Sequence, residues 1–65
     1  MTFKELRKEK KKKQQDLANR IGVSQARISR LDNGAIPDAI EIINLASALR
    51  VSEKRILNLY RKENL

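Results

Sequence analysis

The segment that most constrains the fold is residues 14–34, with the sequence QQDLANRIGVSQARISRLDNG. At a period of about 3.6 residues it divides into two short amphipathic stretches, each with an apolar stripe. The stripes are Leu17, Ala18 and Ile21 in the first stretch, and Ile28 and Leu31 in the second. Between them lie Gly22, which can take a positive φ to end a helix, and Ser24, which can cap the next one. The pattern predicts a helix over 14–21, a tight turn, and a second helix that follows Ser24.

A helix before this segment is indicated by a capping box at the start of the chain. Thr2 and Glu5 have the spacing at which each side chain bonds to the backbone of the other, so a helix is expected over about 3–10. We expect two of its side chains to be buried and three basic ones to face solvent: Phe3 and Leu6 inside, and Lys4, Arg7 and Lys8 outside.

Two further helices are expected after Gly34, which can end the second helix of the central segment in the αL conformation. Asp38 is a suitable N-cap for a helix that ends near Leu49, and Ser52 is a suitable N-cap for the last helix. The expected apolar side of the last helix is Ile56, Leu57 and Tyr60.

Sixty-five residues suffice for one small domain. Five short helices with brief connections and no strand signal predict a compact all-α domain over residues 1–65, with a frayed end at about 61–65. The chain has neither cysteine nor histidine, which excludes a disulfide scaffold and a zinc finger.

The same composition argues against catalysis and metal binding. No Gly-rich phosphate loop is present, and we expect the acidic residues on scattered outward faces rather than in one pocket. No enzyme activity, cofactor, metal or small-molecule ligand is therefore expected. No apolar run is long enough to cross a membrane, and the N-terminal segment lacks the apolar region of a signal peptide, so we expect a cytoplasmic protein.

The net charge of +7 is concentrated in the half of the chain that contains the central segment. Ten of the fifteen basic residues, but only three of the eight acidic ones, lie within residues 1–30. Such a patch is typical of a protein that binds a polyanion, although lysines that only confer solubility are the alternative. The run Lys10 to Lys13 is interpreted either as a loop whose mutual repulsion a phosphate backbone would relieve, or as a solvated loop.

The outward face of the second central helix carries side chains that suit the edges of base pairs. If Ile28 and Leu31 point inward, the opposite face presents Gln25, Ala26, Ser29 and Arg30, with Arg27 at its margin. Gln can bond adenine through N6 and N7, Arg can bond guanine through O6 and N7, and an Ala methyl can pack on a thymine methyl. The same residues on an ordinary surface helix would have no such role, so both interpretations stay open at this point.

In their order and spacing, these features resemble the phage repressor and Cro type of helix-turn-helix domain, the Xre family. The resemblance extends from LRKEKKKKQQDLANRIGVSQARISRLDNG through DAIEIINLASALRVS. It rests on Gln at the start of the first central helix, Leu-Ala in its middle, Gly-Val-Ser at the turn, Ile-Ser and Asn-Gly after it, and Ala-x-x-Leu-x-Val-Ser near the end. It implies a five-helix, lambda-repressor-like DNA-binding fold in a bacterial or phage-encoded protein, associated with the nucleoid when bound.

The resemblance also implies a role for individual residues. The Gln at the position of Gln14 binds a phosphate and braces the Gln at the position of Gln25, which reads a base. Ala26 and Arg30 stand at the other positions that face the major groove, and Ser29 lies on the same outward face. The resemblance places Ser24, Arg27 and Asn33 near the DNA backbone, and the charge of the lysine run predicts further phosphate contacts by Lys11, Lys12 and Lys13.

Three departures from the family pattern have structural consequences. Lys11, Lys12 and Lys13 replace a Gly, an apolar residue and a Ser or Thr cap, so Lys11 is expected to take a positive φ and the next helix to lack a cap. Ala35 and Ile36 follow Asn-Gly where Lys or Arg is common, which weakens the expected backbone contact of this loop. Arg50 stands where a Gly usually ends the fourth helix.

An apolar patch is expected outside the core at Ile36, Ile40 and Ile43. The resemblance implies a homodimer formed through the last two helices, with the recognition helices about 34 Å apart on a roughly palindromic operator. The competing explanation is that Ile40 covers the edge of the last helix.

Two functions of different class follow from these observations. The first is a sequence-specific regulator of transcription that binds double-stranded DNA, most simply a repressor. The second is a protein-interaction module, such as an antitoxin or an anti-repressor partner, that keeps the fold and binds another protein through the isoleucine patch. A role at a membrane surface ranks third, because the first helix lacks the large apolar face that insertion requires.

Overall fold

Five α-helices make up most of residues 1–61, the part of the chain that the computed structural model describes. They are α1 (Phe3–Glu9), α2 (Gln14–Ile21), α3 (Gln25–Asp32), α4 (Ala39–Leu49) and α5 (Glu53–Asn58). No strand occurs within this part, and the expected all-α fold is confirmed. The frayed end expected at about 61–65 falls mainly on residues 62–65, which lie outside the described residues.

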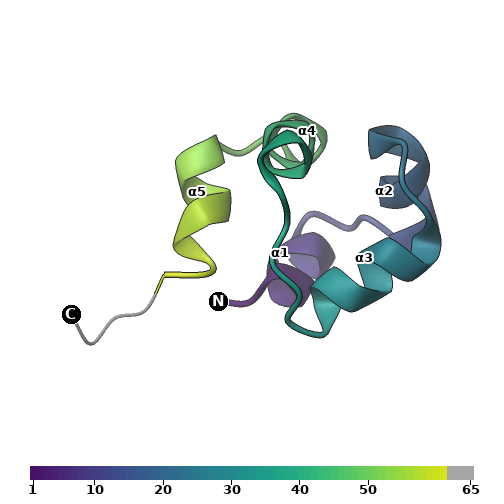
Figure 1. Ribbon diagram of the computed structural model, residues 1–65, viewed down its shortest axis with the longest axis horizontal. Coiled ribbons are helices and arrows are strands. Elements are labelled where there is room, and N and C mark those ends of the chain that lie inside the picture. Colours follow the sequence, from purple (N-terminus) through teal and green to yellow (C-terminus); the bar gives the residue numbers. More distant parts are fainter. Residues whose placement is uncertain (62–65) are drawn as a thin grey trace.

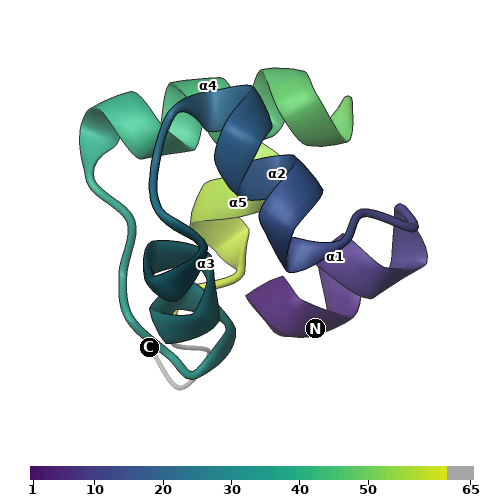
Figure 2. The same cartoon turned by 90° about the vertical axis from the view of Figure 1, so that its right-hand side faces the viewer.

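The helices pack around a shared core in an order that differs from their order in the chain. α2 packs on α3 and on α4, α4 packs on α5, and α1 packs on α3. Figure 1 shows α5 and the α2–α3 pair at opposite ends, with α1 and α4 between them. In Figure 2, α4 lies across the top of α2, and α3 lies at the surface below. None of the helices within residues 1–61 is long and apolar enough to span a membrane.

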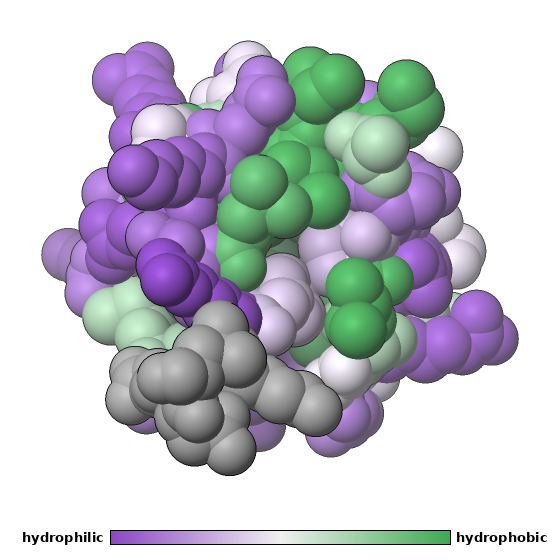
Figure 3. Space-filling model, turned by 60° about the vertical axis from the view of Figure 1, so that its left-hand side comes forward, coloured by the Kyte–Doolittle hydropathy of each residue, from purple (hydrophilic) through white to green (hydrophobic). Residues whose placement is uncertain are grey.

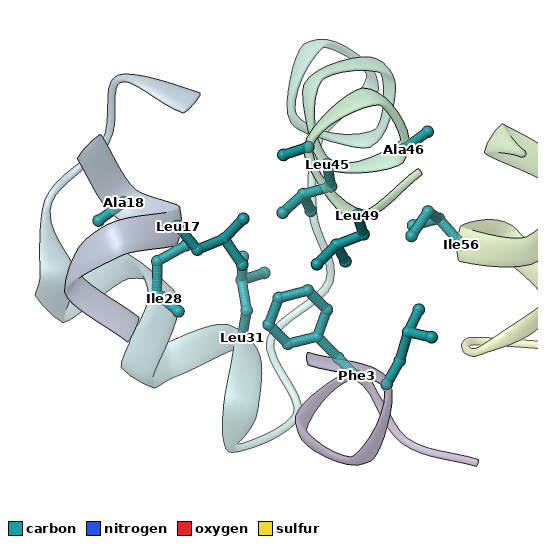
Figure 4. Close-up of a cluster of buried hydrophobic side chains, with 11 residues drawn as sticks. Phe3, Leu17, Ala18, Ile28, Leu31, Leu45, Ala46, Leu49 and Ile56 are labelled. Carbon is teal, nitrogen blue, oxygen red and sulfur yellow. The ribbon is translucent and has the colours of Figure 1, made fainter. Parts of the chain in front are cut away.

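The core contains side chains from all five helices. Each of its buried apolar residues is at most 5% exposed: Phe3, Leu6, Leu17, Ala18, Ile28, Leu31, Leu45, Ala46, Ala48, Leu49 and Ile56. In Figure 4, Leu17 and Leu31 approach Phe3 from one side, and Leu49 approaches it from α4. Because Ile28 and Leu31 are fully buried, the rotation of α3 about its axis is fixed by the core.

Most of the helix starts follow the capping residues that the sequence indicated. Thr2 with Glu5 and Asp38 with Glu41 form complete capping boxes, and the Ser24 and Ser52 side chains accept from backbone N–H groups three residues later. Lys13 makes no side-chain cap at the start of α2, as expected. A side-chain cap typically stabilises a helix by about 1 kcal/mol, so α2 lacks this stabilisation and depends more on its packing.

Two lysine or arginine residues adopt the left-handed conformation that favours glycine. Lys11 has φ 58° in the α1–α2 loop, which confirms the expected positive φ. Arg50 has φ 57° and ψ 46° and ends α4. Gly22, with φ 76°, makes the corresponding turn between α2 and α3 without a steric cost.

One expectation about the last helix is wrong. The sequence pattern predicts Leu57 on the apolar side of α5, but its side chain is 52% exposed, whereas Ile56 is fully buried. α5 is only six residues long and packs on α4 with Ile56 inward, which leaves the adjacent Leu57 side chain in solvent.

Candidate nucleic-acid interface

The outward face of α3 is exposed as the sequence predicted. Gln25, Ala26 and Arg30 are exposed and Ser29 is half-buried, while Ile28 on the opposite side is fully buried. The helix starts sharply, because the Ser24 side chain accepts from the Arg27 N–H at 3.1 Å. Figure 2 shows α3 beside α2 on the side of the molecule that faces the viewer. A short, well-anchored helix therefore presents small polar and cationic side chains to solvent.

A hydrogen bond connects the two glutamines that the resemblance singled out. The Gln25 Nε2 atom of α3 donates to the Gln14 Oε1 atom at the start of α2. Gln14 is half-buried and Gln25 is exposed, so the bond lies at the edge of the α2–α3 packing surface. The Gln25 side chain is therefore held in position before any ligand arrives.

Behind these glutamines lies a buried ion pair that the sequence pattern did not predict. Arg7 donates from Nε to Asp32 Oδ1 at 3.1 Å and from Nη2 to Asp32 Oδ2 at 2.7 Å. The side chains are 8% and 2% exposed, so the expectations that Arg7 faces solvent and that the acids lie on outward faces are wrong here. Burial alone would raise the pKa of Asp32, but hydrogen bonds from Arg7 and Gln14 outweigh it and lower the pKa.

The spacing of apolar residues contained a signal for this pair. Asp32 lies four residues after Ile28, and Arg7 lies four residues after Phe3, so both fall beside buried stripes. Their charge made them look like surface residues, whereas a buried bidentate pair satisfies both groups. Arg7 also donates from Nη1 to the Lys12 carbonyl at 2.7 Å, which fastens the lysine loop to α1.

Gln14 joins this ion pair to the exposed face of α3. Its Nε2 atom donates to Asp32 Oδ2 at 2.8 Å, while its Oε1 atom accepts from Gln25. Hydrogen bonds thus run from Arg7 through Asp32 and Gln14 to Gln25, across α1, α3 and α2. We call these four residues the relay.

A second ion pair holds the connection between α3 and α4. Arg27 donates to both Glu41 carboxylate oxygens at 2.7 Å and to the Ile36 carbonyl at 3.3 Å. The hydrogen bond from Arg27 lowers the pKa of Glu41, although burial acts in the opposite direction. Glu41 also accepts from the Asp38 N–H at 2.9 Å, so Glu41 is a further acid that does not lie on an outward face. The phosphate contact of Arg27 stays a prediction. Independently of it, Arg27 joins α3 to α4 through its bonds to Glu41.

The other predicted phosphate contacts surround the exposed start of α2 and the ends of α3. Lys11 and Lys13 are exposed and Lys12 is half-buried. Asn33 is exposed at the C-terminal end of α3, where its Nδ2 atom donates to the Ser29 carbonyl at 2.9 Å. The lysine loop and the uncapped start of α2 therefore bring positive charge beside Gln14.

The three isoleucines of the predicted apolar patch are exposed. Ile36, Ile40 and Ile43 are 70%, 66% and 48% exposed, and Leu57 of α5 is comparably exposed. Figure 3 shows groups of hydrophobic side chains on the face that α5 forms with α4. Ile40 keeps most of its surface in solvent, which argues against the explanation that it covers the edge of α5.

Comparison with known families agrees with this geometry. A family model described as helix-turn-helix matches residues 3–56, from the first residue of α1 into α5. No curated protein and no solved structure gave a significant match. The matched residues include the whole α2–α3 pair, the ion pairs and the lysine loop. The chain belongs to the Cro/C1-type, Xre-like family of DNA-binding helix-turn-helix proteins.

Proposed function

We propose that this protein is a sequence-specific regulator of transcription that occupies double-stranded DNA, most simply as a repressor. The observation that carries the proposal is the Gln14–Gln25 hydrogen bond on an exposed, core-anchored α3. A side chain that is fixed before binding loses little conformational entropy when it contacts a base edge. An ordinary solvated helix face has no use for such fixation.

In the proposed complex, α3 lies in the major groove and reads base edges. Gln25 bonds adenine, Arg30 bonds guanine, and the Ala26 methyl and Ser29 hydroxyl supply smaller contacts. Each good bidentate contact is worth about 1–3 kcal/mol of discrimination against the wrong base.

Phosphate contacts around α3 set its position on the duplex. Gln14 and the lysines 11–13 approach one backbone segment, since all four lie at the start of α2. Ser24, Arg27 and Asn33 contact phosphates on either side of the reading face. These contacts supply affinity that is independent of sequence and decreases with salt.

A second copy of the chain completes the proposed operator complex. One α3 presents only four side chains to the groove, which limits the sequence that a single copy can read. Docking of Ile36, Ile40 and Ile43 against the same surface of another copy gives a two-fold dimer and therefore a roughly palindromic site. The exposure of these isoleucines supports the proposal.

Selection of bound sites from a random pool of DNA duplexes tests the function. We expect one enriched, roughly palindromic sequence, bound at least about a thousandfold more tightly than a scrambled duplex at physiological salt. Equal binding to both duplexes, with a steep dependence on salt, would leave only contact with phosphates and would overturn the proposal.

The isoleucine patch also supports a second candidate, in which the protein is an antitoxin or an anti-repressor partner. Contiguous exposed apolar surface commonly marks a protein interface. In that case DNA binding is secondary, and the Ile40→Glu variant loses the protein partner while its affinity for DNA stays unchanged. The same variant loses affinity for the palindrome if the patch joins two copies on DNA.

A further inference from the structure

The hydrogen bonds of the relay can run in only one direction. An ionised carboxylate accepts hydrogen bonds and donates none, so Asp32 requires donors from both of its neighbours. Arg7 is always a donor, and Gln14 must therefore direct its NH2 group toward Asp32. The lowered pKa of Asp32 keeps the carboxylate ionised at neutral pH.

This direction propagates to the exposed end of the relay. With its NH2 group turned toward Asp32 and one of its two hydrogens bonded there, Gln14 turns its carbonyl oxygen toward α3 and accepts from Gln25. One hydrogen of the Gln25 NH2 group is then used. What Gln25 retains for a ligand is its carbonyl oxygen and one remaining N–H.

An acceptor beside a single donor matches one purine. Adenine presents the N6 amino group as a donor and N7 as an acceptor in the major groove, so it pairs with both remaining functions of Gln25. Guanine presents two acceptors, O6 and N7. Bonding guanine well would require the Gln25 amide to turn over and offer both N–H groups, and its oxygen would then face the Gln14 oxygen.

We propose that Asp32 is a specificity-determining positioning residue. Through Gln14, its buried carboxylate fixes the direction of the Gln25 amide and makes α3 select adenine over guanine at one base pair. This inference rests on the proposed function, because it assigns the origin of a sequence preference. Asp32 acts without touching DNA, from a position that is 2% exposed.

Four variants and one base-pair exchange test the inference. Gln25→Ala first identifies the base pair that Gln25 contacts, because this variant no longer discriminates between bases at that pair. At that pair, the ratio of affinities for adenine and guanine duplexes is measured in Asp32→Asn, Gln14→Met and a control, Gln15→Met.

Asp32→Asn and Gln14→Met each change the relay in a defined way, and the control leaves it intact. The new amide in Asp32→Asn can accept from Gln14 or donate to it, so the direction is no longer fixed. Gln14→Met removes the connection while leaving the Arg7–Asp32 pair in place. Gln15 is exposed, and within residues 1–61 its side chain bonds to Asn19 and not to the relay, so its substitution matches Gln14→Met in chemistry without touching the relay.

We expect the adenine preference to fall by about fivefold or more in Asp32→Asn and Gln14→Met, and to be unchanged in Gln15→Met. A role confined to stability or phosphate binding would weaken both duplexes equally and leave the ratio unchanged, which would overturn the inference. If Asp32→Asn does not fold, Gln14→Met alone decides, since it spares the ion pair.

A wild type that shows no preference among duplexes would instead refute the proposed function. In that case the direction of the Gln14 amide can still be measured in the DNA-free protein, from the NMR signals of its side-chain NH2 group. Absence of a hydrogen bond from this group to Asp32 would overturn the inference.

Discussion

At the scale of single residues, the side chains proposed to read bases are distinct from the side chains that fix the fold around them. Gln25 and Arg30 are exposed on α3 and have no place in the core. Arg7 and Asp32 are buried and have no access to a ligand. Gln14 lies between the two sets and bonds to both.

Gln25→Ala should therefore affect specificity, while a lysine substitution should affect only general affinity. We expect Gln25→Ala to cost about 1–3 kcal/mol on the selected operator and to relax the preference at one base pair. The control Lys13→Ala should weaken all duplexes alike and reduce the salt slope by about one. Titrations of both variants at several salt concentrations measure these effects, and an equal loss on operator and scrambled DNA in Gln25→Ala would contradict the assigned role.

The two buried carboxylates predict a loss of stability in acid. The folded pKa values of Asp32 and Glu41 lie below their ordinary values of 3.8 and 4.5, so the unfolded chain takes up protons first as the pH falls. Their stabilisation is complete above about pH 5 and is lost progressively as the pH falls through the lowered folded values. Urea unfolding between pH 2 and pH 6, roughly the range in which carboxylates titrate, measures this dependence. Asp32→Asn and Glu41→Gln should each flatten it, and an unchanged slope in both would refute the linkage.

At the scale of helices, much of the fold could be predicted because caps and apolar spacing act locally. The capping boxes and Ser24 marked the helix starts, and the inward side of α3 followed from Ile28 and Leu31. The relay could not be predicted in this way, because Arg7 and Asp32 are 25 residues apart and their pairing depends on how α1 docks on α3. The pairing of Arg27 with Glu41 likewise depends on the path of the chain between α3 and α4.

The end of α4 offers a test of backbone strain. Arg50 holds an αL conformation that costs a residue with a Cβ about 1–2 kcal/mol, and part of this is recovered by the lower flexibility of the unfolded chain. Arg50→Gly should therefore raise the free energy of unfolding by about 0.5–1 kcal/mol, as measured by urea denaturation. Arg50→Ala is the matched control, since it removes the side chain but keeps the Cβ. An equal gain in both variants would show that the charge, not the backbone, was responsible.

At the scale of the whole molecule, the proposed reading face and the apolar patch lie on different elements. The proposed reading face is the outward side of α3, whereas the patch comes from the α3–α4 connection and the first two turns of α4. The ion pair between Arg27 and Glu41 lies between them and fixes their relative orientation. A dimer formed through the patch would therefore hold its two α3 helices at a defined separation.

The proposed dimer predicts that a charge in the patch disrupts assembly. Ile40→Glu should shift sedimentation at micromolar concentration to that of a monomer and reduce affinity for a palindromic duplex more than for a single half-site. Ser47→Glu, at an exposed position later in α4, adds the same charge outside the patch and should change neither. A wild type that sediments and binds DNA strictly as a monomer would contradict the dimer.

The relay also determines how the specificity of this domain could be changed by design. The outward residues of α3 can be exchanged as a set, because the core and Ser24 hold the helix in place without them. Asp32 belongs to the same helix but bonds to Gln14 on its inner side, and in our proposal it acts from there on the outward face. A recognition helix transplanted from a relative would therefore keep its own base preference at position 25 only if its residue 32 supplied the acceptor that Gln14 requires. A helix graft should accordingly include every residue that these hydrogen bonds join, so positions 14 and 32 should be exchanged together.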